Sequence, residues 1–148
     1  MGKFYQELRR YERAISLYKQ SLATSREIGA QQTEAVSLSN LGKAYQFFGN
    51  KASNLETAIA AYQNALQIYT REAFPVDWAR TQNNLAIAYR HRIRGDKADN
   101  LEHAITSCQN ALQIRTREAF PIEWEKTQKN LRLIQTDKEK LEKKITEV

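Results

Sequence analysis

The sequence predicts an all-α protein, an α-solenoid built from antiparallel pairs of helices. A segment of 36 residues occurs twice without gaps, at 54–89 and 100–135, with 22 identities between the copies. Apolar residues recur every three or four positions, which is the period of a helix and not of a strand. Gly (5) and Pro (2) are rare among the 148 residues, which disfavours the turn-rich all-β folds.

A third, more diverged copy precedes these two at an offset of 44. The matching residues are Ala14 with Ala58, Tyr18 with Tyr62, Asn40 with Asn84, and Tyr45 with Tyr89. Paired helices repeated at a fixed period stack so that each unit packs on its neighbours. The pattern therefore predicts one array rather than separate globular domains.

The apolar stripes, taken in order, predict six helices and a short N-terminal stub. The stub is expected at 3–8, and the helices at 11–29, 31–48, 54–72, 76–93, 100–118 and 122–147. Gly49-Asn50 and Gly95-Asp96 are typical of helix ends. Two capping boxes are expected to start the next helices, Ser53 with Glu56 and Asp99 with Glu102.

Phe74-Pro75 and Phe120-Pro121 divide the remaining helices. Proline suits the first turn of a helix, because its missing N–H would have no intrahelical partner there. We therefore expect a single array over 1–148, with a partial repeat at 1–29, repeats at 30–72 and 73–118, and a terminal capping helix at 119–148. The abrupt start inside a repeat suggests a fragment of a longer array.

The last helix has a second interpretation. Arg132 and Gln135 replace a small residue and a tyrosine of the earlier copies. Such a polar outer face suits a terminal cap. Heptad-like spacing of apolar residues among many Lys and Glu also fits a coiled-coil linker, and we favour the cap.

The motif residues resemble the tetratricopeptide repeat, whose pattern contains Leu-Gly-x2-Tyr followed by Ala-x3-Phe. Here Leu41, Gly42 and Tyr45 supply the first part, and Ala58 and Tyr62 the second. The resemblance implies a right-handed superhelix. The period of 44–46 exceeds the usual length of about 34 and is similar to the long repeats of bacterial, particularly cyanobacterial, proteins. HEAT and armadillo repeats have similar periods but fit these motifs less well.

Composition restricts the classes of function. The net charge of +6 is spread along the chain, whereas nucleic-acid binders concentrate Lys and Arg on one face. Cys108 is the single cysteine, so no internal disulfide is expected. No apolar run reaches the length of a membrane span, and no signal peptide is visible. We expect a cytoplasmic protein with no membrane association and no cofactor.

The family resemblance implies that the first helix of each repeat lines a concave groove for a peptide. It places one asparagine per repeat there, Asn40, Asn84 and Asn130, similar to the asparagine ladder of kinesin light chain. An amide can donate to and accept from a peptide backbone. The alternative role for each asparagine is to order the adjacent loop.

Further polar residues fall around this ladder: Lys43, Arg80, Asn83, Arg90, Lys126 and Lys129. A groove lined by these side chains would be basic and would suit an acidic peptide or a terminal carboxylate, which arginine binds through two N–H groups. The alternative for each Lys or Arg is a solvated surface position.

No other residues indicate chemistry. Trp78 and Trp124 recur at the same repeat position and are expected to pack between repeats. His91 and His103 lack the spacing of a metal-binding pair, and no nucleophile with an oriented base is present. We expect a protein–protein interaction module rather than an enzyme. The alternatives are a helical-repeat nucleic-acid binder and a spacer that self-assembles through its array ends.

Overall fold

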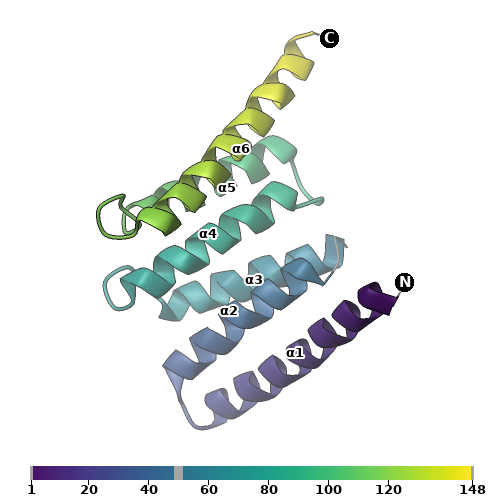
Figure 1. The fold of residues 1–148 in the computed structure, drawn as a ribbon, viewed down its shortest axis with the longest axis vertical. Helices are drawn as coiled ribbons and strands as arrows, with labels where there is room; N and C mark the ends of the chain where they lie inside the picture. The colour runs from purple at the N-terminus through teal and green to yellow at the C-terminus, as the bar shows by residue number, and fades with distance from the viewer. Residues whose placement is uncertain (1, 49–51, 148) are drawn as a thin grey trace. The chain divides into compact units, whose positions relative to one another are not determined.

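The computed structural model describes residues 2–48 and 52–147, which contain six helices and no strand. In chain order the helices are α1 (Gly2–Glu27), α2 (Gln31–Phe47), α3 (Ala52–Ile68), α4 (Pro75–His91), α5 (Lys97–Leu112) and α6 (Pro121–Thr146). The prediction of an all-α helical-repeat fold is confirmed (Figure 1).

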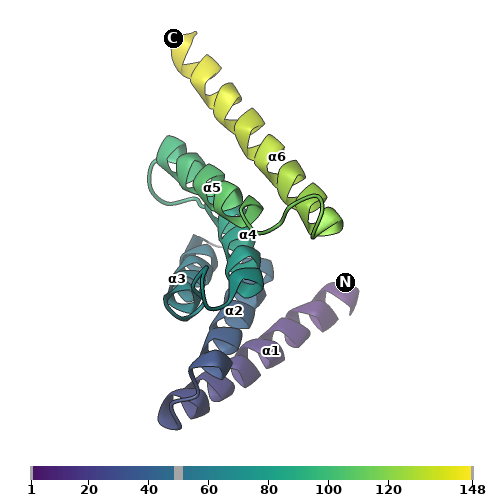
Figure 2. The same ribbon diagram turned by 90° about the vertical axis from the view of Figure 1, so that its left-hand side faces the viewer.

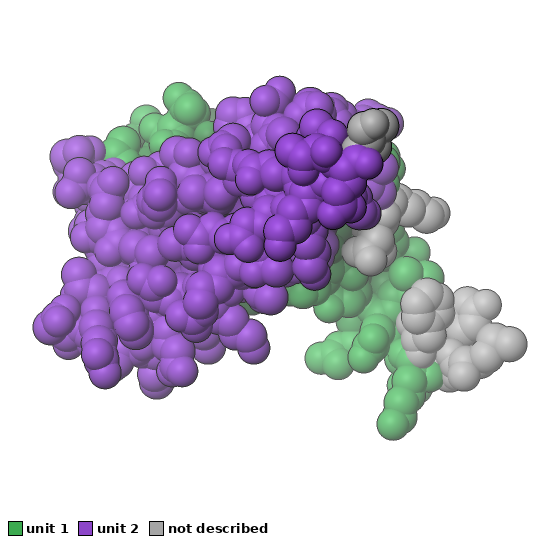
Figure 3. All heavy atoms as spheres, turned by 90° about the horizontal axis from the view of Figure 1, so that it is seen from above, with its two compact units in different colours: residues 1–70 green, residues 71–148 purple. Residues whose placement is uncertain are grey.

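The helices form two compact units, residues 1–70 and 71–148. Figure 3 distinguishes these units by colour. Unit 1 holds α1, α2 and α3, and in unit 2 the helices are α4, α5 and α6. Consecutive helices within each unit run antiparallel (Figures 1 and 2). In the repeat, α1 corresponds to the second helix of a pair and α4 to the first helix of a pair. Unit 1 thus begins with a second helix, whereas unit 2 begins with a first helix.

The first helix differs from its prediction, because the stub expected at 3–8 is part of one helix, α1. No glycine or proline separates the stub from the helix expected at 11–29, so the helix continues without a break. The helix ends at Glu27, two residues before Gly29, whose φ of 68° lies in the left-handed region. The Ala30 N–H then donates to the Ser25 carbonyl at 2.8 Å, as in a Schellman motif.

Both Phe-Pro connections adopt the same backbone conformation. Phe74 has φ −138° and ψ 62°, and Phe120 has φ −139° and ψ 64°. Proline disfavours the α conformation in the residue before it. The preceding helices end at Ile68 and Leu112, earlier than the predicted residues 72 and 118. In unit 2 the Thr116 hydroxyl accepts from the Ala119 N–H at 3.2 Å and stabilises the turn.

The start of α5 also differs from its prediction. Asp96 is the N-cap, and its carboxylate accepts from the Asp99 N–H at 3.0 Å. The cap expected at Asp99 therefore lies one turn earlier, directly after Gly95 with its φ of 80°. The other expected capping residue, Ser53, lies within α3. The helix end expected at Gly49-Asn50 falls outside the described residues.

A close contact between glycine and tyrosine organises the core of unit 1. A Cβ atom built on Gly42 would lie 2.8 Å from the fully buried ring of Tyr62. Glycine at this position therefore lets α2 approach α3. At the same two positions of the next repeat, unit 2 has Ala86 and Cys108, both fully buried. The large Tyr62 ring of unit 1 is thus paired with glycine, and the small Cys108 side chain of unit 2 is paired with the larger alanine.

Candidate functional site

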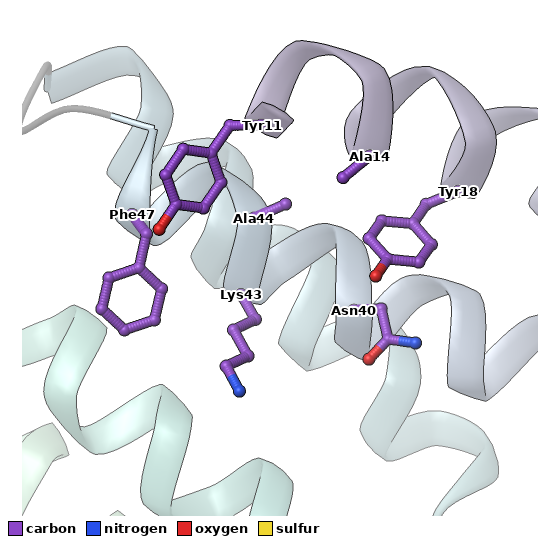
Figure 4. Close-up of a pocket in the computed structure, with 7 residues that line it drawn as sticks. All are labelled: Tyr11, Ala14, Tyr18, Asn40, Lys43, Ala44 and Phe47. Atoms are coloured by element: carbon purple, nitrogen blue, oxygen red, sulfur yellow. The ribbon is translucent and has the colours of Figure 1, made fainter. Parts of the chain in front are cut away.

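A pocket of about 330 Å³ lies between α1 and α2 of unit 1 (Figure 4). Two predicted groove residues, Asn40 and Lys43, line it together. The lining residues are Tyr11, Ala14, Tyr18, Asn40, Lys43, Ala44 and Phe47. The pocket thus combines aromatic walls with one amide and one cation.

The two tyrosine rings project from α1 toward α2 (Figure 4). Tyr18 lies beside Asn40 at one end of the pocket, and Tyr11 lies toward Phe47 at the other. The Phe47 side chain is 56% exposed, so its ring is available for contact at the pocket. Lys43 is exposed, and no ion pair holds it among the residues that the structure describes. The pocket therefore offers apolar contact and an uncompensated positive charge.

Unit 2 uses three of the predicted groove residues to join α6 to α4. The Asn130 side-chain N–H donates to the Asn83 amide oxygen at 3.1 Å. Two turns further along, Arg90 Nε donates to an Asp137 carboxylate oxygen at 2.7 Å. Asn83 is buried, and both ion-pair partners are partly buried. These three side chains therefore have structural partners within unit 2.

Arg80 lines a different, smaller pocket of about 190 Å³ in unit 2 and pairs with Asp77 on its own helix at 2.5 Å. Arg115, which was not among the predicted groove residues, lines the same pocket. Burial lowers the pKa of Arg115, and Glu123 opposes that effect. Its Nη1 donates to the Thr127 hydroxyl at 3.0 Å. The signal for Arg115 was its place in the repeat, where the preceding copy has the buried Tyr69.

The remaining predicted residues lie apart from these contacts. Asn84 is half-buried on α4, and Lys126 and Lys129 are exposed on α6. Neither lysine makes an ion pair within the described part of the chain. Among the described residues, Lys43, Lys126 and Lys129 are therefore the predicted cations without an ion-pair partner, whereas Arg80 and Arg90 are paired.

Three other titratable side chains of unit 2, His103, His91 and Cys108, are influenced by the residues around them. The His103 ring stacks on Tyr89, with ring centroids 5.0 Å apart. Burial, with Arg90 and Lys97, lowers the pKa of His91. Cys108 is buried, and burial raises the pKa of its thiol to about 11. The described residues contain no group of three His, Cys, Asp or Glu side chains able to hold a metal ion.

None of the helices in the described ranges is both long enough and apolar enough to cross a membrane.

Antiparallel helix pairs, repeated along the chain with a small residue packed on the second helix, define a helical-repeat protein. Family models described as tetratricopeptide repeat match residues 1–53 and 78–118, which together make up more than half of the chain. The chain belongs to the tetratricopeptide repeat family. A comparison with curated proteins gives no match. Repeats of this family generally mediate protein–protein interaction and are typically non-catalytic.

Proposed function

We propose that this chain is a protein-interaction module that binds an acidic peptide segment of a partner, with the pocket of unit 1 as the principal contact. The observation that carries this proposal is the composition of that pocket. Its aromatic walls, Tyr11, Tyr18 and Phe47, stand beside the polar Asn40 and Lys43. Binding pockets commonly combine apolar walls with a few polar groups that fix orientation.

Each kind of lining group has a separate role in this proposal. The aromatic rings take up an apolar side chain of the peptide, which removes apolar surface from water. The Asn40 amide can donate to and accept from the peptide backbone. Lys43 attracts a carboxylate, because no acidic side chain of the described residues pairs with it. These contacts favour a peptide in which apolar and acidic residues are neighbours.

Unit 2 contributes electrostatic attraction in this proposal. Lys126 and Lys129 are exposed on α6, and Asn84 is half-buried on α4. Exposed charges such as those of the two lysines affect the rate of association and the choice of partner more than the affinity. Arg80 and Arg90 contribute less, because their charges are compensated by Asp77 and Asp137.

Site-specific photo-crosslinking from the pocket tests the proposal. A photoreactive phenylalanine at Phe47 replaces a ring that is already exposed at the pocket. We expect it to crosslink acidic peptide segments in a lysate treated with nuclease. Lys43→Glu is expected to reduce the yield at least fivefold, because it replaces attraction of a carboxylate with repulsion.

The matched control is Arg9→Glu, which makes the same charge change at an exposed position on the opposite face of α1. This variant is expected to keep the crosslinks. Equal loss in both variants would show that overall charge, rather than the pocket, determines binding. Crosslinks that disappear with nuclease would indicate nucleic acid in place of a peptide.

A further inference from the structure

The smaller pocket of unit 2 combines charged groups of both signs with an apolar wall. The charged lining residues are Arg80, Arg115 and Glu123. The apolar wall consists of Val76, Ile114 and Phe120. The volume of about 190 Å³ is smaller than the clefts of roughly 300 Å³ and above that hold drug-sized ligands. The pocket therefore suits a small molecule.

Arg115 and Glu123 line this pocket, but neither makes an ion pair within the described residues. Arg115 Nη1 donates to the Thr127 hydroxyl at 3.0 Å, and that hydroxyl donates to the Glu123 backbone carbonyl at 2.8 Å. Burial lowers the pKa of Arg115 and Glu123 opposes this effect, so the two charges lie near each other. The other side-chain N–H groups of Arg115 make no hydrogen bond in the described part of the chain. One positive and one negative charge are thus available to a ligand.

The repeat itself does not require the arginines of this pocket. At the position of Arg115 the preceding copy has the buried Tyr69, and at the position of Arg80 it has Val36. Ile114, by contrast, is isoleucine in both copies. Apolar or aromatic side chains therefore satisfy the packing at both arginine positions, and the two cations of unit 2 indicate a role in binding.

We propose that this pocket binds a free α-amino acid with an aliphatic side chain. The α-carboxylate accepts from the remaining N–H groups of Arg115, because a planar guanidinium can donate two parallel hydrogen bonds to a carboxylate. The α-ammonium group pairs with the Glu123 carboxylate, and the aliphatic side chain covers the apolar wall. Arg80 adds a weaker attraction for the carboxylate, since Asp77 compensates its charge.

The two opposite charges favour this class of ligand over a simple ion. An inorganic anion would be repelled by the Glu123 carboxylate, and a metal cation would be repelled by the Arg115 guanidinium. Either ion would also leave the apolar wall in water. A zwitterion with an aliphatic side chain satisfies both charges and the wall. The inference is independent of the peptide site proposed in unit 1, because the two pockets share no lining residue.

Amide chemical shifts of the isotope-labelled full chain, followed by NMR as L-leucine is added, test the inference. We expect shifts at Ile114, Arg115 and Phe120. Arg115→Tyr, which introduces the residue type of the preceding copy, is expected to weaken binding more than tenfold. Arg94→Tyr is the matched control, because Arg94 is exposed and does not line the pocket. Its affinity for leucine is expected to stay within twofold of the parent chain.

Changes to the ligand test its charged groups one at a time. N-acetyl-L-leucine lacks the ammonium charge and L-leucinamide lacks the carboxylate, and each is expected to bind at least tenfold more weakly than leucine. Glu123→Gln is expected to weaken leucine but to strengthen N-acetyl-L-leucine, because it removes repulsion of the carboxylate. A purely structural role of Glu123 would weaken both ligands alike and would overturn its assignment.

Two further results would overturn the inference. One is the absence of shifts in the pocket at a large excess of leucine. The other is equal binding of leucine and N-acetyl-L-leucine, since the pocket would then recognise a carboxylate alone, such as the C-terminus of a peptide. Neither result affects the peptide site of unit 1, which the crosslinking experiment tests separately.

Discussion

The side-chain amide of Asn130 on α6 donates a hydrogen bond to the amide oxygen of Asn83 on α4, at 3.1 Å. Asn130 is one of the three repeat asparagines that were predicted to face a peptide. In unit 2 its amide joins two first helices, and the buried Asn83 accepts the bond. Any contact of Asn130 with a ligand must therefore use its remaining donor and acceptor.

This hydrogen bond predicts an effect on the stability of unit 2. Asn130→Ala should lower the free energy of unfolding by about 1 kcal/mol, because the buried Asn83 oxygen loses its partner. Urea unfolding followed by tryptophan fluorescence measures it, since both tryptophans, Trp78 and Trp124, lie in unit 2. The double variant with Asn83→Ala should lose less than the sum of the single losses. Strict additivity would show that the two amides are not coupled.

The sequence was sufficient for the helix order, because the repeat and its apolar stripes specify it. The start of α4 was expected at residue 76 and lies at Pro75, since proline fixes a first turn. The helices α3 and α5 end earlier than their apolar periodicity predicts, because the turns after Ile68 and Leu112 depend on local hydrogen bonds rather than on periodicity.

The candidate site was predicted less completely than the fold. Asn40 and Lys43 line one pocket, yet the sequence pattern does not predict that the aromatic side chains beside them line it too. Tyr11 and Tyr18 match core positions of later repeats, so the pattern alone indicates burial. Their exposure depends on which neighbouring helix is present, and a single helix's periodicity carries no information about its neighbours.

The contact between α2 and α3 predicts how Gly42 responds to substitution. Gly42→Ala places a methyl group against the buried Tyr62 ring, and should lower the free energy of unfolding by roughly 1–3 kcal/mol. Thermal unfolding followed by circular dichroism measures the effect, because unit 1 contains no tryptophan.

The second repeat supplies a compensating change for this contact. Ala86 and Cys108 stand at the two matching positions and are both fully buried. Tyr62→Cys alone should destabilise by creating a cavity. The double variant Gly42→Ala/Tyr62→Cys should lose less free energy of unfolding than the sum of the losses in the two single variants. A double variant as unstable as that sum would contradict a steric conflict between the methyl group and the ring.

Unit 2 should lose stability at mildly acidic pH because of His91. Burial and the neighbouring Arg90 and Lys97 lower its pKa, while Asp137 acts in the opposite direction. The unfolded chain, where histidine titrates near 6.5, then binds the proton more readily than the folded chain. Stability should therefore fall as the pH drops below 6.5 toward the folded pKa, and level off beneath it.

The urea concentration at the midpoint of unfolding, measured by tryptophan fluorescence between pH 5 and 8, tests this dependence. Histidine changes its charge within this pH range. His91→Gln should reduce the slope, and His103→Gln, which leaves His91 in place, should retain it. An unchanged slope in His91→Gln would assign the dependence to other groups.

The single cysteine gives a direct measure of opening in unit 2. Cys108 is buried, and burial raises the pKa of its thiol to about 11. Because the thiol is fully buried, a disulfide reagent should reach it only when the helices around it open, so the native chain at pH 8 should react at least about a hundredfold more slowly than the unfolded chain. Asn130→Ala should increase the native rate by weakening the contact between α4 and α6. Rapid, complete labelling of the native chain would show that the thiol is accessible without opening of the helices around it.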